Sequence, residues 1–307
     1  MTKTGGEFGL IEWIRRRVAA HPALDTGIGD DAAVLYWPAE KTLVTVDMLM
    51  EGVDFTFPPA SPEQVGRKAL AVNLSDIAAM GGKPITAVVA VSLPRHRGAE
   101  FAQRLHEGIE QRAREFDVAL AGGDTNSWDG PLVISITVLG EPAGRGPVRR
   151  SGARAGDWIL VTGAFGGSIA GHHLDFTPRV REGLLLAENH DVHSMIDVSD
   201  GLAADLHHIL DESRVGAMLF ADRIPISAAA LGTDDGRTSL DHALSDGEDF
   251  ELIFTVSAET AQALLVTRPF DTPLTHIGFI EASPGCRLQL ADGSKREVPA
   301  LGWRHEL

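Results

Sequence analysis

Aspartates that directly follow short apolar runs recur along this chain, and they limit the folds that it can adopt. The run Val118-Ala119-Leu120 reads as a buried strand, and it continues into Ala121-Gly122-Gly123-Asp124-Thr125. Two glycines permit a tight turn and a close approach of the backbone to a ligand. In α/β proteins, ligands bind beyond the carboxyl ends of strands. The segment therefore predicts a strand that ends at Asp124 in a ligand site, although a polar turn is the better explanation when the segment is taken alone.

Other segments repeat this arrangement of an acid beside glycines or apolar residues. Asp30 and Asp31 follow Gly27-Ile28-Gly29, and Asp47 ends the apolar run Leu43-Val44-Thr45-Val46. The run Met195-Ile196-Asp197 leads into Val198-Ser199-Asp200-Gly201, where Ser199 or Asp200 could cap the next helix. That capping role leaves Asp197, inside the strand, without an explanation.

A further acid belongs to an apolar helix. Ser61-Pro62-Glu63-Gln64 has the residues of a helix start, and the helix is expected to run to Met80. Asn73 and Asp76 are three residues apart on it and share a face. A buried hydrogen-bond network and a ligand site are both open for this pair.

Carboxylates gathered in one place would need a counter-charge. The candidates share a position at the end of a strand or on an apolar helix: Asp30, Asp47, Asp76, Asp124, Asp197 and Asp200. Oxygen ligands together with a phosphate substrate indicate Mg²⁺. Glycoside hydrolysis needs only two carboxylates, and aromatic residues make up just 6% of the chain, which is few for stacking on sugars. A metal-assisted phosphoryl transfer fits better, and a phosphate monoester acceptor would need no general base, because its second pKa is about 6.

Composition excludes several other classes of protein. The formal net charge of −16 makes nucleic acid an unfavourable partner. No apolar run is long enough for a membrane helix, and no export signal is recognisable at the N-terminus. Cys286 is the sole cysteine, which rules out internal disulfides and favours a cytoplasmic location.

Two acid- or glycine-rich turns have open interpretations. Gly163-Ala164-Phe165-Gly166-Gly167-Ser168 could present amides to a phosphate at the start of a helix, but tight packing explains these glycines slightly better. Asp246 and Asp249 precede the strand 252–256 and could be ligands or members of a solvated turn. The Pro/Gly-rich stretch 141–147 suggests a domain boundary, with domains at 1–143 and 144–307.

Taken in order, these motifs resemble the thiamine-monophosphate kinases, of the superfamily that includes aminoimidazole ribonucleotide synthetase. The segments that carry the resemblance span nearly the whole chain: Gly5-Gly6-Glu7-Phe8, Gly27-Ile28-Gly29-Asp30-Asp31, Thr45-Val46-Asp47, residues 71–81, Gly122-Gly123-Asp124-Thr125, Arg150-Ser151-Gly152-Ala153, residues 197–202 and Gly247-Glu248-Asp249-Phe250-Glu251-Leu252.

The resemblance implies an α/β (α+β type) protein of two α/β domains. The N-terminal domain would bind ATP and Mg²⁺ and form a homodimer through a mixed sheet, and the C-terminal α/β sandwich domain would complete the active site. The implied reaction is the ATP-dependent phosphorylation of thiamine monophosphate to thiamine diphosphate by in-line transfer.

The resemblance also implies roles for single residues. Metal ligands would be Asp30, Thr45, Val46, Asp47, Asp76, Asp124, Asp197 and Asp200, of which Asp30, Asp124 and Asp200 would be catalytic. Nucleotide contacts would come from Gly123, Asp124, Arg150 and Ser199, and thiamine contacts from Asp54, Glu248 and Trp303.

Two features depart from the family pattern. The family has a histidine facing the substrate where this chain has Asp54, whose charge would repel a substrate phosphate unless it binds a metal or the thiazolium. The segment from Gly171 to Arg181 is also short. A related ribonucleotide cyclo-ligase and a binder of phosphorylated ligands that no longer catalyses are the alternatives that the sequence leaves open.

Overall fold

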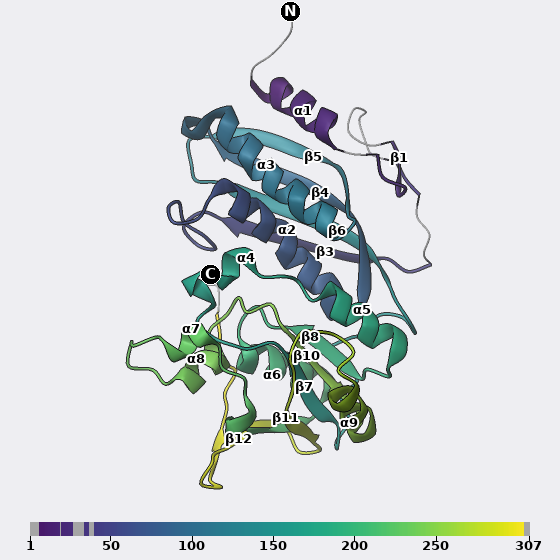
Figure 1. Cartoon of the computed structure of the whole chain (residues 1–307), viewed down its shortest axis with the longest axis vertical. Coiled ribbons are helices and arrows are strands. Elements are labelled where there is room, and N and C mark those ends of the chain that lie inside the picture. Colours follow the sequence, from purple (N-terminus) through teal and green to yellow (C-terminus); the bar gives the residue numbers. More distant parts are fainter. Residues whose placement is uncertain (1–5, 19, 27–33, 37–39, 304–307) are drawn as a thin grey trace, which may run out of the picture. The chain divides into compact units, whose positions relative to one another are not determined.

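The chain forms two compact units in a computed structural model that describes residues 6–18, 20–26, 34–36 and 40–303. The first unit comprises residues 1–77 and 83–141, and the second comprises residues 78–82 and 142–307. Each unit contains helices and a β-sheet (Figure 1). The α/β class and the two-domain organisation expected from the sequence are therefore confirmed.

The first unit is built on a four-stranded mixed sheet in the order β3-β6-β4-β5. Its strands are β3 (Leu43–Met50), β4 (Gly82–Pro94), β5 (Ala119–Trp128) and β6 (Val133–Pro142). β3 pairs with β6 in antiparallel orientation, whereas β4 and β5 are parallel. This order places β3 and β5 at opposite edges of the sheet. A separate two-stranded sheet joins β1 (Leu24–Thr26) and β2 (Val34–Leu35).

Helices α2 (Pro62–Ala79) and α3 (Gly98–Glu115) cover one face of this sheet (Figure 1). α2 starts as the sequence predicts, because the Ser61 hydroxyl accepts the Gln64 N–H and the Gln64 side chain accepts the Ser61 N–H. Such a capping box satisfies two amides that the first turn leaves without helical partners.

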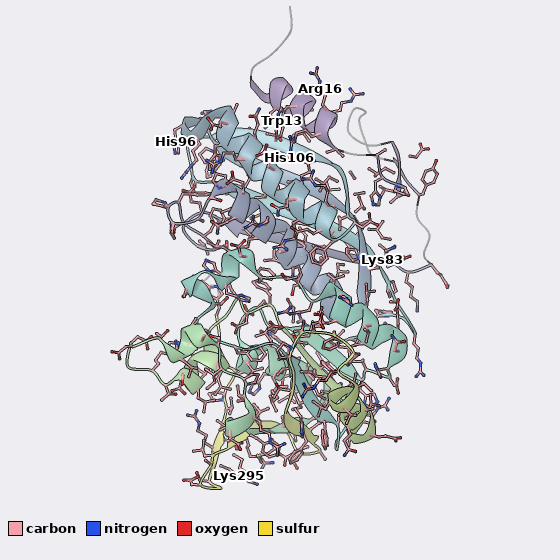
Figure 2. The ribbon with its side chains drawn as sticks, viewed as in Figure 1. Trp13, Arg16, Lys83, His96, His106 and Lys295 are labelled. Atoms are coloured by element: carbon pink, nitrogen blue, oxygen red, sulfur yellow. The ribbon has the colours of Figure 1, made fainter. Side chains whose placement is uncertain are left out.

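The N-terminal helix α1 (Gly6–Arg17) packs on α3 through aromatic and charged contacts. The Trp13 and His106 rings meet edge to face at a centroid distance of 5.8 Å, between two helices that lie next to each other (Figure 2). Arg17 Nε donates to Glu110 at 3.1 Å. Burial lowers the pKa of His106 to about 4, so its ring is neutral at pH 7.

The other face of the four-stranded sheet exposes apolar side chains among the residues that the structure describes. Val44, Val46 and Met48 alternate along the edge strand β3, and each is at least 60% exposed. The residues between them face the helices, and Leu43 and Leu49 are buried there. Val88 on β4 is also exposed.

The second unit contains a seven-stranded sheet in the order β13-β12-β9-β11-β7-β10-β8. Its strands are β7 (Trp158–Thr162), β8 (Ser194–Asp197), β9 (Gly216–Phe220), β10 (Leu252–Val256), β11 (Leu274–Glu281), β12 (Gly285–Gln289) and β13 (Lys295–Glu297). Its pairs are antiparallel except for β12 with β9. Figure 2 shows Lys295 on β13, which pairs with β12.

Helix α6 (Leu202–Ser213) is the central helix of the second unit. Its residues Leu206 and Ile209 are fully buried against side chains of the sheet such as Ile159 and Ile253. The other helical segments of this unit are η2 (Ser168–Ala170), α4 (His172–Asp175), α5 (Val180–Asn189), η3 (Ala221–Arg223), α7 (Ala228–Leu231), α8 (Ser239–Ser245) and α9 (Ala258–Thr267), and η1 (Arg95–Arg97) belongs to the first unit.

Two strands differ from the sequence expectation. β3 does not end at Asp47, and β5 does not end at Asp124; the two strands continue to Met50 and Trp128. The reason is pairing with a neighbour, because β6 extends along β3 as far as Met50 and β4 extends along β5 as far as Trp128. No helix among the described residues is long and apolar enough to span a bilayer.

Candidate active site

The first group of acids lies where β3 passes the end of α2. Thr45 and Asp47 point to the helix-covered side of β3, and the Thr45 hydroxyl donates a hydrogen bond to Asp76 Oδ2 near the end of α2. All three side chains are partly buried. The structure therefore brings Thr45 and Asp76 together, on the face that also carries Asp47. Val46 points to the opposite, open face.

Asp124 is not near this group within one chain. It lies on the edge strand β5, where it pairs with Ala90, and its side chain is exposed. Three strand spacings separate β5 from β3, which amounts to about 14 Å. Its ladder neighbours Val88 and Ala90 are exposed on the open face of the sheet, so Asp124 also lies on the side opposite Asp76.

Gly123 is required by the neighbouring strand. A Cβ added to it would lie 1.8 Å from Val89 O, whereas a Cβ on Gly122 would meet nothing within 4 Å. The close approach expected at this glycine pair is therefore made to β4.

Three hydrogen bonds hold Asp54 in the loop after β3, and in one of them its N–H donates to Met50 O at 3.0 Å. Its carboxylate accepts the Met50 N–H at 2.6 Å, and its carbonyl accepts from Lys68 Nζ at 2.7 Å. Lys68 is completely buried, so its ammonium group holds this loop against α2. The Asp54 charge, which the sequence assigned to substrate contact, is thus engaged within its own loop. Asp30 lies outside the described residues.

The second unit assembles several of the remaining candidates around the loop that follows β8. The Glu248 N–H donates to Ser199 O at 2.7 Å, and the Trp303 N–H donates to Asp200 O at 2.9 Å. Asp197, at the end of β8, is buried and pairs with Leu252. This unit therefore places Asp197, Ser199, Asp200, Glu248 and Trp303 in one neighbourhood.

The segment beside this loop has an uncommon backbone. Glu248 and Phe250 have φ values of +65° and +51°, which residues other than glycine rarely adopt. Such conformations concentrate at functional sites. The Phe250 N–H donates to Val198 O at 2.7 Å, so the strained segment is bonded to the acidic loop at both Val198 and Ser199.

Asp205 is a site residue that the sequence reasoning missed. Its Oδ2 accepts the N–H groups of Asp200 and Gly201, both at 3.0 Å, so neither Ser199 nor Asp200 caps α6 as expected. Burial, together with the charges of Asp197 and Asp200, raises the pKa of Asp205 to about 8, against the lowering effect of the two amides. The sequence feature that could have identified Asp205 is an acidic residue in the first turn of a helix that follows an acidic loop.

Asp205 also belongs to the group of side chains that could hold a metal. Ligand atoms of Asp200, Asp205 and His208 lie within 4.8 Å of one another. Carboxylate oxygens suit Mg²⁺, whereas imidazole favours transition metals.

The glycine turn after β7 binds protein carboxylates. The Gly166 N–H donates to both Asp249 oxygens at 3.0 and 3.1 Å, and the Gly167 N–H donates to Asp246 at 2.8 Å. The packing interpretation of this turn is confirmed, and no long helix follows it, only η2 and α4. Burial raises the pKa of Asp249 to about 8, against the lowering effect of the Gly166 amide.

Arg150 lies on an exposed turn before β7. The Ser213 hydroxyl donates to Arg150 O at 3.1 Å and accepts the N–H groups of Gly152 and Ala153, each at 3.1 Å. Among the described residues, the Arg150 guanidinium has no hydrogen-bond or ion-pair partner. It is therefore available to an anion.

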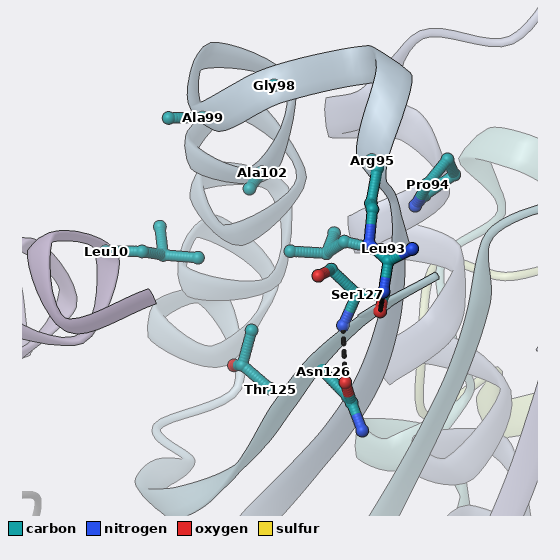
Figure 3. A pocket seen from close by; sticks show the side chains of 10 residues that line it. All are labelled: Leu10, Leu93, Pro94, Arg95, Gly98, Ala99, Ala102, Thr125, Asn126 and Ser127. Carbon is teal, nitrogen blue, oxygen red and sulfur yellow. Dashed lines mark hydrogen bonds between the residues drawn. The ribbon is translucent and has the colours of Figure 1, made fainter. Parts of the chain in front are cut away.

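A cavity of about 240 Å³ lies in the first unit between α1, α3 and the ends of β4 and β5 (Figure 3). Leu10, Leu93 and Ala102 form apolar walls, and Thr125 and Asn126 form a polar edge. Thr125 follows Asp124, and the two side chains point to opposite faces of β5. The ten residues that line the cavity include none of the acids described above.

Comparison with known proteins gives the family of this chain. The family model of AIR synthase related protein, N-terminal domain, matches residues 29–141, and that of the C-terminal domain matches residues 154–291. The chain is 42% identical to a thiamine-monophosphate kinase of Rhodopirellula baltica, over 97% of each sequence.

Comparison with solved structures gives the same family. The thiamine-monophosphate kinase of Stenotrophomonas maltophilia superposes with a TM-score of 0.81 at 37% identity, covering 96% of this chain and 98% of that one. AaThiL complexed with AMPPCP and TMP gives a TM-score of 0.71 at 28% identity, covering 100% and 98%.

Proposed function

This chain belongs to the thiamine-monophosphate kinases of the AIR synthase related family, and we propose from that membership how its residues carry out the reaction. The reaction is the transfer of the γ-phosphoryl group of ATP to the phosphate of thiamine monophosphate, which yields thiamine diphosphate and ADP. The 42% identity over nearly the full length is the observation that carries this conclusion.

The oxygen-rich side chains are suited to Mg²⁺. The proposed ligands are the side chains of Asp30, Thr45, Asp47, Asp76, Asp124, Asp197 and Asp200, together with the main-chain carbonyl of Val46, whose side chain has no oxygen. The hydrogen-bonded pair Thr45 and Asp76 and the carboxylates of buried Asp197 and nearby Asp200 supply hard oxygen donors, which is the donor set that Mg²⁺ prefers. When bound, the metal would neutralise charge on the two phosphorylated substrates.

The protein's own task is to position the substrates. The acceptor phosphate is largely dianionic at pH 7 and needs no general base, so the main obstacle is repulsion between anions. Asp30, Asp124 and Asp200 are proposed as the catalytic acids, through the metal. Gly123, Asp124, Arg150 and Ser199 would hold the nucleotide, and the unpartnered guanidinium of Arg150 supports this assignment.

Glu248 and Trp303 are proposed to contact thiamine. Their backbones border the acidic loop, and the Trp303 ring is half exposed. Thiamine is a cation, so a carboxylate and an aromatic face are both favourable partners. Asp54 is also proposed to contact thiamine, because its negatively charged carboxylate would attract the positively charged thiazolium ring.

We also propose that the protein is a homodimer formed through the open face of the four-stranded sheet. Val44, Val46 and Met48 make this face apolar, and apolar patches of this kind mark interaction sites. Asp124 lies on the same face, away from Asp76. A second copy on this face would bury the apolar side chains and bring Asp124 to the subunit interface.

The test of the function is a turnover assay. Purified protein is incubated with ATP, MgCl₂ and thiamine monophosphate, and thiamine diphosphate and ADP are quantified by chromatography. Equal amounts of both products are expected, with neither product in a control that lacks MgCl₂. Binding of both substrates without ADP release would instead identify a binder that does not catalyse.

A further inference from the structure

The hydroxyl of Ser213 is the centre of a small hydrogen-bond cluster that holds the turn carrying Arg150. Ser213 is the last residue of α6, and its Oγ makes three hydrogen bonds of 3.1 Å to this turn. One hydroxyl thus uses its donor and both of its acceptor positions on a single turn.

Backbone contacts hold the same turn from the other side. The Met195 N–H donates to Arg149 O at 3.0 Å, which attaches the start of the turn to β8. Gly152 has a φ of +126°, and a Cβ added there would lie 2.3 Å from His193 O. The turn is therefore confined between the start of β8 and the end of α6, and Ser213 supplies the side-chain contact.

We propose that Ser213 is a positioning residue for the nucleotide, which acts by fixing the turn from which Arg150 reaches a phosphate group. This inference rests on the proposed function, since Arg150 is assigned to the nucleotide there. A flexible turn would have to be ordered when the anion binds, and that ordering weakens affinity. A turn already fixed by three hydrogen bonds avoids the loss.

The position of Ser213 in the chain supports a role beyond helix stability. Alanine is the better residue in a helix, so the hydroxyl is not needed for α6 itself. It is also distinct from a substrate ligand, because its donor and acceptor positions are filled by protein backbone.

The test is a double-mutant cycle read out by nucleotide affinity. Isothermal titration calorimetry with AMPPCP and MgCl₂ gives Kd for the unaltered chain, Ser213→Ala, Arg150→Ala and the double variant. Loss of the hydrogen bonds is expected to raise Kd roughly five- to tenfold in Ser213→Ala. The double variant should bind no more weakly than Arg150→Ala, because Ser213 acts through that residue.

Controls separate positioning from a loss of structure. Ser213→Thr keeps the hydroxyl and should restore Kd, and Arg149→Ala removes the same charge one residue away and should change Kd far less than Arg150→Ala. The KM for thiamine monophosphate should not change in Ser213→Ala.

Two results would overturn the inference. Additive effects of Ser213→Ala and Arg150→Ala would show that Ser213 acts by another route, and an unchanged Kd in either single variant would remove the link to the nucleotide. Failure of the proposed function would give a different result from failure of this inference. The unaltered chain would bind AMPPCP, so the double-mutant cycle could still be measured, but no thiamine diphosphate would form.

Discussion

The substitution Gly123→Ala should destabilise the first unit strongly, whereas Gly122→Ala should not. A Cβ at Gly123 would lie 1.8 Å from Val89 O, 2.7 Å from Val89 C and 3.0 Å from Val89 N. These are all backbone atoms of the neighbouring strand β4, so no side chain can rotate out of the way.

The loss of stability depends on how far β4 and β5 must separate to make room for the methyl group. Ordinary contact begins at 3.4 Å, so β4 and β5 would have to separate locally by roughly 1.6 Å. Forcing a methyl group into a packed region costs about 1–3 kcal/mol. Each ladder hydrogen bond broken by the separation adds about 1 kcal/mol. The expected loss in the free energy of unfolding is therefore about 2–4 kcal/mol.

Gly122→Ala is the matched control, because it adds the same methyl group one residue earlier. Its Cβ meets nothing within 4 Å and its φ is not positive, so reduced freedom of the unfolded chain should stabilise it by about 0.5 kcal/mol. Urea denaturation of both variants without ligands, followed by circular dichroism, gives the two values. Equal stabilities would refute the view that Gly123 is required by β4, and a defect of Gly123→Ala only in nucleotide binding would show that the ligand requires it.

Three further outcomes are expected. Asp124→Ala should abolish thiamine diphosphate formation and the rise in melting temperature that Mg²⁺ with ATP gives the unaltered chain, with the ligand-free melting temperature unchanged; near-normal turnover would contradict its role. The raised pKa of Asp249 means that the folded state retains a proton that the unfolded state loses, so its contribution to stability falls as pH rises from about 4 to about 8. Asp249→Asn should flatten the fall in urea midpoint over that range, and parallel curves would count against the shift. Val46→Lys should give monomers in sedimentation velocity, whereas Val266→Lys, at a side chain 83% exposed on α9, should leave dimers; dimers in both would exclude the open face as the interface.

The sequence predicted the fold well where local signals and burial agree. The capping box at Ser61 and Gln64 correctly placed the start of α2. The sequence prediction failed where pairing between strands determines how far a strand extends. Nothing between Gly122 and Trp128 is apolar enough to indicate a strand, yet the parallel partner β4 extends β5 through these residues.

The sequence predicted only part of the site, because the contacts between its residues depend on the tertiary structure. Helical spacing placed Asp76 on one face of an apolar helix, but only the tertiary structure shows that Thr45 donates to it. Asp205 was missed because a carboxylate in the first turn of a helix is common, and its two bonds to the Asp200 loop depend on the backbone path before the helix. The separation of Asp124 from Asp76 depends on strand order, and the face on which Asp124 lies depends on its register with β4; no local pattern encodes either.

The uncovered face of the four-stranded sheet has a consequence for how the activity should respond to dilution. Burial of a side chain such as Val44 or Met48 contributes about 1.5–3 kcal/mol of stabilising free energy. A single copy lacks this stabilisation, because these side chains are exposed. Because Asp124 lies on the same face, the proposed homodimer would link turnover to association. Specific activity should therefore decline below a threshold protein concentration, and resistance to heat should decline with it.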